Sequence, residues 1–179
     1  NVIVVGDPGR VQLISSFFDS IEFQISNREF VTHTGTYKNT RFTVIATGIG
    51  TDNIDIVLNE LDAAVNIDLN TKEIKSEKRS LNIVRIGTSG ALQADIPIDS
   101  FLLSEKAMGF DGLLHFYSDE LNVNETEISK AFCAHANWND NLAKPYVVSA
   151  HQELVSKLES GTLKGITATA SGFYAPQGR

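Results

Sequence analysis

The sequence has little cysteine, methionine or tryptophan, with one of each among its 179 residues. The single cysteine, Cys133, excludes a disulfide within the chain and is compatible with a reducing compartment. No apolar run approaches the roughly 20 residues that a membrane-spanning helix requires. These absences exclude a disulfide-stabilised secreted domain and a membrane span, and they predict a globular protein of the cytoplasm that has no membrane partner.

Positive charge is also scarce, because 15 Lys and Arg residues face 22 Asp and Glu residues and give a net charge of -7. Such a balance excludes nucleic acid as a partner, since a phosphate backbone demands clustered Lys and Arg. Any anion site must therefore be local and built from a few arginines. A hydrophobic content of 42% over this length predicts one domain with a sizeable core that requires neither disulfides nor a structural metal.

Short apolar runs alternate with helical patterns along the whole chain. The predicted strands are residues 2–5, 43–46, 81–86, 101–103, 146–149 and 166–170. Apolar spacing predicts a first helix from Val11 to Ile21, a second over 54–61 with Thr51 or Asp52 as N-cap, and others near 126–136 and 151–159. Strands that alternate with helices define an α/β fold with a mainly parallel sheet.

Two segments depart from this alternation. The stretch "FVTHTGTYKNTRFTVIATG", residues 30–48, alternates around the turn "YKNTR" and predicts an antiparallel hairpin. Residues 66–80 are polar and of mixed charge, which predicts a solvated excursion that can include a short strand.

Four loops at predicted strand ends concentrate glycine, hydroxyl and arginine residues. They are "GDPGR" (6–10), "TGIGTDN" (47–53), "RIGTSG" (85–90) and "TASGFYAPQGR" (169–179). The first matches neither the dinucleotide fingerprint nor the P-loop, and alone it is better explained by a plain strand-to-helix turn. Ligands of open α/β sheets bind outside the carboxyl ends of the strands, where these loops lie. Together the loops therefore predict one shared site for an anion and a small molecule.

The side chains of these loops suit such a ligand. Arg10 and Arg85 can neutralise an anion, and Thr88 and Ser89 can donate hydroxyl groups. In the last loop, Phe173 can stack on a planar heterocycle that Gln177 and Arg179 hydrogen-bond.

Other candidate residues favour plain structural roles. His33, His115, His135 and His151 lack metal-ligand spacing, and "GTSG" lacks the elbow that would make Ser89 a hydrolase nucleophile. Asp119, Glu120, Glu125 and Glu127 predict a solvated loop and a helix start, and Phe17, Phe18, Phe110 and Trp138 predict core or interface positions.

Five segments in order carry a resemblance over nearly the whole chain: "VVGDPGRV", "NREF", "ATGIG", "IVRIGTSGALQADIPIDSFLLSEKAMGFDGLLHFY" and "FYAPQGR". They resemble the nucleoside phosphorylase family, in particular its uridine phosphorylase branch. The resemblance implies a three-layer α/β fold, with a mixed, mainly parallel central sheet flanked by helices, and one domain over residues 1–179.

The resemblance also implies a role for each matching residue. Phosphate would be bound by Gly6, Arg10, Arg28, Arg85 and Thr88, and Thr88 would also face the ribose. The base would be bound by Ser89, Gly90, Phe173, Gln177 and Arg179, and the Gln and Arg pair favours a pyrimidine. In the family, the arginine at position 28 reaches the site of a neighbouring subunit, so a dimer is the minimal active unit and a hexamer, a trimer of dimers, is typical. Glu29, Ile49 and Asn53 fall where some relatives hold a monovalent cation, although "TDN" departs from the usual loop.

The implied reaction is phosphorolysis of uridine to uracil and ribose 1-phosphate through an oxocarbenium-like transition state, with inorganic phosphate as co-substrate and no other cofactor. We expect the domain to be incomplete at both ends, because the chain starts inside an apolar run without Met and stops before the family's ribose-binding glutamate. The alternatives are a purine nucleoside phosphorylase, a nucleosidase of the same fold and a silent nucleoside-binding homologue.

Overall fold

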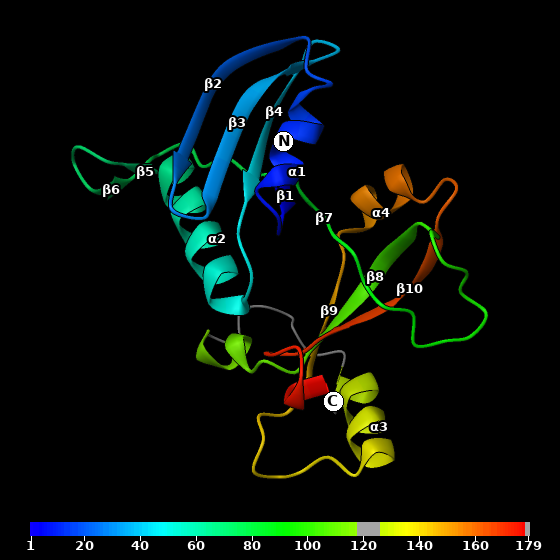
Figure 1. Cartoon of the computed structure of the whole chain (residues 1–179). Helices are drawn as coiled ribbons and strands as arrows, with labels where there is room; N and C mark the ends of the chain where they lie inside the picture. Colours follow the sequence, from blue (N-terminus) through cyan, green and yellow to red (C-terminus); the bar gives the residue numbers. More distant parts are fainter. Residues whose placement is uncertain (118–125, 178–179) are drawn as a thin grey trace. The chain divides into compact units, whose positions relative to one another are not determined.

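The computed structural model describes residues 1–117 and 126–177. They form two compact units, Asn1–Thr88 and Ser89–Arg179, which are drawn in one view in Figure 1. Each unit has its own sheet, and both combine strands with helices, which confirms the α/β class.

The first unit is built on a five-stranded sheet in the order β2-β3-β4-β1-β7. Its strands are β1 (Val2–Val5), β2 (Ser20–Asn27), β3 (Phe30–Tyr37), β4 (Thr40–Ala46) and β7 (Ile83–Ile86), and its helices are α1 (Gly9–Ser15) and α2 (Thr51–Asn66). Strand β1 is parallel to both of its neighbours, whereas β2, β3 and β4 run antiparallel to one another and lie side by side in Figure 1. The sheet is therefore mixed, as expected.

Apolar side chains point to both faces of this sheet because successive strand residues alternate in direction. Val5, Val44 and Ala46 form one buried cluster with Val11 of α1. On the other face, Val2, Val4 and Ile45 pack with Val57 of α2. One helix thus covers each face, which confirms the three layers in this unit.

The first predicted helix is wrong at its end. Helix α1 stops at Ser15, and Ile21 lies on β2, a strand that helical spacing concealed. The chain leaves the helix because the Asp19 N–H donates to the Thr36 carbonyl oxygen (2.7 Å), which starts the pairing with β3. Ladder hydrogen bonds with β3 therefore outweigh the local periodicity of residues 11–21.

The predicted N-cap of the second helix is also wrong. Gly50 is the N-cap residue of α2, with φ 107°, and Thr51 is already helical. Neither Thr51 nor Asp52 caps the helix, because a glycine with this φ makes the sharp entry into the first turn.

The predicted hairpin is confirmed in β3 and β4. Lys38 and Asn39 have φ of 48° and 61°, which is typical of a two-residue type I′ turn. The excursion over 66–80 is confirmed as well: it carries the short pair β5 (Ile67–Asp68) and β6 (Glu73–Ile74), and residues 71–80 are exposed.

The second unit contains a three-stranded sheet in the order β10-β8-β9. Its elements are β8 (Leu102–Gly109), η1 (Leu113–Phe116), α3 (Thr126–Ala136), β9 (Tyr146–Ser149), α4 (Gln152–Leu158), β10 (Leu163–Thr169) and η2 (Ala175–Gln177). Strand β8 extends well beyond the predicted 101–103, whereas β9, β10, α3 and α4 lie where the sequence placed them.

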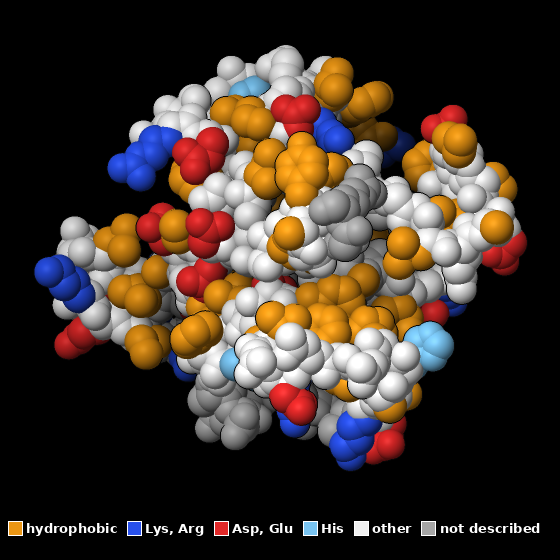
Figure 2. All heavy atoms as spheres, turned by 60° about the horizontal axis from the view of Figure 1, so that its bottom comes forward, with side chains coloured by type: hydrophobic (Ala, Val, Ile, Leu, Met, Phe, Trp, Pro, Cys, Tyr) orange, Lys and Arg blue, Asp and Glu red, His pale blue; other side chains and the backbone are white. Residues whose placement is uncertain are grey.

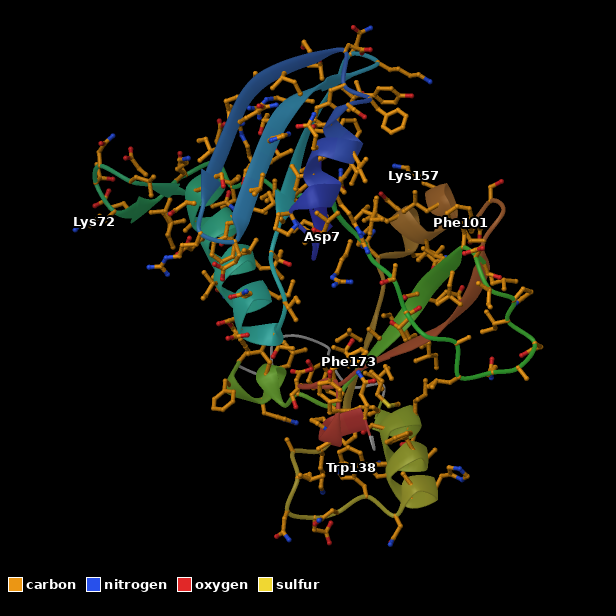
Figure 3. The ribbon with its side chains drawn as sticks, viewed as in Figure 1. Asp7, Lys72, Phe101, Trp138, Lys157 and Phe173 are labelled. Atoms are coloured by element: carbon orange, nitrogen blue, oxygen red, sulfur yellow. The ribbon has the colours of Figure 1, made fainter. Side chains whose placement is uncertain are left out.

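The residues set aside as structural have separate environments. Phe110 and Trp138 pack with Phe132, with ring centroids 5.1 to 5.8 Å apart, and Trp138 is labelled in Figure 3. Phe18 packs against the core cluster beside α1, whereas Phe17 is exposed. Glu127 lies in the first turn of α3, and Asp119, Glu120 and Glu125 fall outside the described residues.

Within the described residues, no group of three His, Cys, Asp or Glu side chains is placed to hold a metal ion. His33 is buried, and its Nδ1 is 2.8 Å from Ser15 Oγ. No helix in residues 1–117 and 126–177 is long and apolar enough to cross a membrane.

Candidate functional site

The first wall of the site is the turn that leaves β1. Asp7 closes this turn by accepting a hydrogen bond from the Gly9 N–H at Oδ1 (2.9 Å), and the Arg10 N–H donates to the Asp7 carbonyl oxygen (3.1 Å). Figure 3 labels Asp7 where the chain passes from β1 to α1. The turn places Arg10 on the first turn of α1, half-buried.

The second wall follows β4. Thr47 is buried and fastened to β1, since its N–H donates to the Val5 carbonyl oxygen (2.8 Å). Gly48 comes next with φ 70°, a conformation in which side chains are strained. A Cβ at Gly48 would also lie 2.8 Å from Asn53 Nδ2 and 3.0 Å from Glu29 Cγ. Glycine is therefore required where this loop passes the β2–β3 turn.

The third wall is the end of β7. Arg85 is in register with Val4 of β1, and its guanidinium lies close to the backbone of Gly87 and Gly6. Because β1 and β7 are parallel, the residues that follow them emerge at the same edge of the sheet.

These segments enclose one pocket of about 670 Å³, here called the strand-end pocket. It is lined by Gly6, Asp7, Pro8, Arg10, Glu29, Gly48, Ile49, Asn53, Arg85, Gly87 and Thr88. All of these residues belong to the first unit. Ten of them come from three of the four loops that the sequence singled out, and Glu29 comes from the turn between β2 and β3.

The charges of the strand-end pocket are unequally satisfied. The Asp7 carboxylate is bonded to its own turn, and the Glu29 carboxylate accepts from Asn53. In contrast, Arg10 and Arg85 have no carboxylate partner among the described residues. Two unpaired guanidinium groups in a pocket of glycine turns suit a small oxyanion, which a planar fork binds through paired hydrogen bonds.

The structure brings four predicted phosphate residues together, because Gly6, Arg10, Arg85 and Thr88 all line this pocket. Arg28 does not line it. It lies exposed in the two-residue turn between β2 and β3, with φ 55°.

The three residues expected to hold a monovalent cation also meet at the pocket. Asn53 Nδ2 donates to Glu29 Oε1 and to the Ile49 carbonyl oxygen, each at 3.3 Å. An amide nitrogen thus lies where the two oxygens converge. A cation would fit there only if the Asn53 amide turned its oxygen inward, because the nitrogen can donate but not ligate.

The expected base-binding residues belong to the second unit. Ser89 and Gly90 are exposed at its start, Phe173 is 61% exposed, and Gln177 ends η2. Figure 3 labels Phe173 just before that helix. Arg179 lies outside the described residues.

Sequence reasoning missed four of the lining residues as site residues: Asp7, Pro8, Gly48 and Gly87. Their signal was present, because each stands inside one of the quoted loops. Only the spatial structure shows that Gly48 faces Glu29 and Asn53, and that Gly87 faces Arg85.

The fold is an α/β fold, and the strand-end pocket lies at the carboxyl ends of the strands of its first sheet, with a lining that suits an oxyanion. The family model described as "Phosphorylase superfamily" matches residues 2–179, and the chain belongs to this superfamily.

The curated relatives that match this chain include both uridine and purine nucleoside phosphorylases. The chain is 30% identical over 178 residues to a uridine phosphorylase of Thermococcus kodakarensis, covering 99% of this chain and 53% of the relative. It is 27% identical over 174 residues to a DeoD-type purine nucleoside phosphorylase of Brevibacillus brevis, covering 97% and 62%. Both pyrimidine and purine names thus occur among the relatives.

A solved structure gives the same result. The nucleoside phosphorylase of Trypanosoma brucei, described as showing uridine phosphorylase activity, has a TM-score of 0.85 and 31% identity, covering 99% of this chain and 64% of that chain. This likeness confirms the expected fold. The chain spans about half to two thirds of the length of these relatives.

Proposed function

We propose that the protein to which this chain belongs is a pentosyltransferase that cleaves uridine with inorganic phosphate and releases uracil and ribose 1-phosphate. The observation that carries the proposal is the pair of unpaired arginines, Arg10 and Arg85, in a glycine-walled pocket of a phosphorylase-superfamily fold. A nucleosidase, which uses water, has no use for such a pair.

The chemistry matches what these residues offer. Phosphate is already a nucleophile at neutral pH and needs to be held next to C1′ of the ribose rather than activated by a base. Arg10 and Arg85 can fix its oxygens, and the Thr88 hydroxyl can orient phosphate or ribose. Positioning and charge stabilisation then account for catalysis, because the transition state resembles an oxocarbenium ion.

The base end of the proposed site depends on the C-terminal loop. Phe173 would stack on the base, Ser89 and Gly90 would line its pocket, and Gln177 and Arg179 would hydrogen-bond the uracil edge. Charge that grows on the uracil oxygens as the base leaves would be stabilised by Arg179. The pairing of an amide with a guanidinium supports a pyrimidine.

We propose self-association as part of the same function. Arg28 stands on an exposed turn outside the pocket of its own chain, which supports a role in a neighbouring subunit's phosphate site. Exposed large apolar side chains are numerous in the described part of the chain, and Figure 2 shows apolar side chains at the surface. A dimer is the smallest assembly that this arrangement requires, and a hexamer would repeat it.

Two further expectations are proposals of the same kind. The continuous family match over residues 2–179 supports one phosphorylase domain that includes both compact units.

A monovalent cation at Glu29, Ile49 and Asn53 would show as stabilisation by potassium but not by choline at equal ionic strength.

The deciding experiment measures uracil release from uridine by the whole protein with and without phosphate. Release that requires phosphate, together with ribose 1-phosphate as product, is expected. Release unchanged without phosphate would establish a nucleosidase, and uridine binding without turnover would establish a silent binding protein. Because purine nucleoside phosphorylases occur among the relatives, inosine is assayed in parallel, and a higher kcat/KM for inosine would reassign the substrate.

A further inference from the structure

We propose that Gly87 is a positioning residue for phosphate, because its missing side chain leaves the space in which the Arg85 guanidinium lies. The proposal rests on the proposed function and extends it to a residue that does not itself contact the substrate. Gly87 would act only through Arg85.

The register of the sheet explains why these residues meet. Arg85 pairs with Val4 and Ile86 pairs with Val5, so Gly87 and Gly6 are the residues that follow the last pair of two neighbouring parallel strands. Residues two apart on an extended chain point to the same side. The Arg85 side chain therefore extends over the position that a side chain at residue 87 would fill.

The distances show how closely the guanidinium occupies this place. A Cβ at Gly87 would overlap Arg85 Nη1 and lie 3.4 Å from Cζ and 3.8 Å from Nη2. A Cβ at Gly6 would lie 3.8 Å from the same Nη2, an ordinary contact. The fork thus lies against Gly87 and beside Gly6, in the strand-end pocket that all three residues line.

Backbone conformation does not explain the glycine at position 87. The glycines with positive φ are Gly48, Gly50, Gly112 and Gly161 among the described residues, and Gly87 is not one of them. The three heavy atoms nearest to its Cβ position all belong to Arg85. Alanine can therefore adopt the backbone at 87 without strain, and its methyl group would conflict only with the arginine.

Because the conflict involves only the Arg85 side chain, Gly87→Ala should affect phosphate binding and leave the stability of the fold unchanged. Arg85 is exposed and its end is flexible, so a methyl group can push the guanidinium aside without disturbing the core. We expect Gly87→Ala to weaken phosphate binding about 10-fold to 100-fold, as a misplaced fork loses charge-assisted hydrogen bonds. The midpoint of thermal unfolding and the KM for uridine should stay close to those of the unmodified protein.

The test is a double-mutant cycle on the whole protein, with Gly87→Ala, Arg85→Ala and the combined variant. Calorimetry with inorganic phosphate, the KM for phosphate and the unfolding midpoint are measured for each. The matched control is Gly165→Ala in β10, where a Cβ would meet only an ordinary 3.7 Å contact with Leu102. Because one residue acts through the other, Gly87→Ala should have no further effect on phosphate once Arg85 is alanine.

Each outcome decides the proposal. Phosphate binding by Gly87→Ala equal to that of the unmodified protein would overturn it, and so would equal losses in both backgrounds. If Gly87→Ala fails to fold, the combined variant decides: a folded combined variant supports the steric conflict with Arg85, and an unfolded one overturns it. Absence of phosphate binding by the unmodified protein would instead refute the proposed function, and this inference with it.

Discussion

Two arginines of the same sheet have different partners: Arg41 lies near the start of the central strand β4, and Arg85 lies near the end of the edge strand β7. At the hairpin side, Arg41 of β4 donates from Nε to both carboxylate oxygens of Glu22 on β2, at 3.0 and 2.9 Å, and its Nη2 lies 2.8 Å from Oε2. At the carboxyl edge, Arg85 of β7 has no carboxylate partner in the part of the chain that the structure describes. One guanidinium is satisfied by the fold, and the other is left for a ligand.

The pKa values follow the same division. The hydrogen bond from Arg41 lowers the pKa of Glu22 more than desolvation raises it, and Glu22 in turn raises the pKa of Arg41. Net charge alone would not separate these arginines, since both are exposed cations of one small sheet. Their surroundings do: Arg41 faces the Glu22 carboxylate across strand β3, and Arg85 lies among glycine turns.

The largest effect is expected from Arg85→Ala. Removal of a group that holds charge in the transition state should lower kcat/KM for phosphate by about 100-fold to 1,000-fold. Affinity for uridine should fall far less, because the base end uses other residues. The comparison requires Arg41→Ala to leave the kinetics for phosphate unchanged. Equal loss of phosphate and uridine affinity in Arg85→Ala would show that this arginine does not serve phosphate.

A charge-conserving change sharpens the same comparison. Arg85→Lys keeps the cation but loses the planar fork, and we expect a roughly 10-fold rise in the KM for phosphate, which corresponds to about 1.4 kcal/mol. The steady-state KM at saturating uridine measures it. A value equal to that of the unmodified protein would mean that charge alone, rather than paired hydrogen bonds, holds the anion.

The sequence predicted the loops at the carboxyl ends of the strands around Arg85, but it predicted little of the part of the sheet that holds Arg41. The loops after β1, β4 and β7 were identified because glycine beside arginine and hydroxyl residues is a local signal. Strand β2 was missed because Ile14, Phe18 and Ile21 share helical spacing, and only pairing with β3 shows where the helix ends. The Glu22–Arg41 pair depends on that pairing across 19 positions, so no local pattern could indicate it.

Within the site the limit was similar. Arg10 and Arg85 were predicted from residue type, whereas the roles of Gly48 and Gly87 depend on which side chains pass above them. Such contacts are set by the register of parallel strands. In a single sequence the only sign of that register is the apolar run of each strand, and two such runs can be paired in several registers.

A smaller effect, on stability, is expected from Thr47, which lies between the strand ends that carry the strand-end pocket. Thr47 is 1% exposed, and its Oγ1 lies 3.3 Å from the Val5 carbonyl oxygen and 3.2 Å from that of Gly48, so it joins the ends of β1 and β4. Thr47→Val keeps the shape and removes the hydroxyl, which should cost about 1 kcal/mol of unfolding free energy. Urea unfolding measures this, with Thr40→Val on the exposed start of β4 as control. No loss of stability would show that the hydroxyl does not join these strand ends.

The smallest effect tests the paired arginine through pH. The pKa of Glu22 is lowered from 4.5 in the folded protein, so the unfolded state binds its proton first as pH falls. The stabilisation by this pair is therefore complete above pH 4.5 and is lost as pH falls through the lowered pKa. Glu22→Gln should lower the unfolding midpoint slightly at pH 7, and the difference should shrink as pH falls below 4.5 and vanish once Glu22 is protonated in both states. Because both side chains are exposed, high salt should also reduce it. A difference that stays constant as pH falls from 7 to well below 4.5 would assign the effect of Glu22 to packing on β2 rather than to charge.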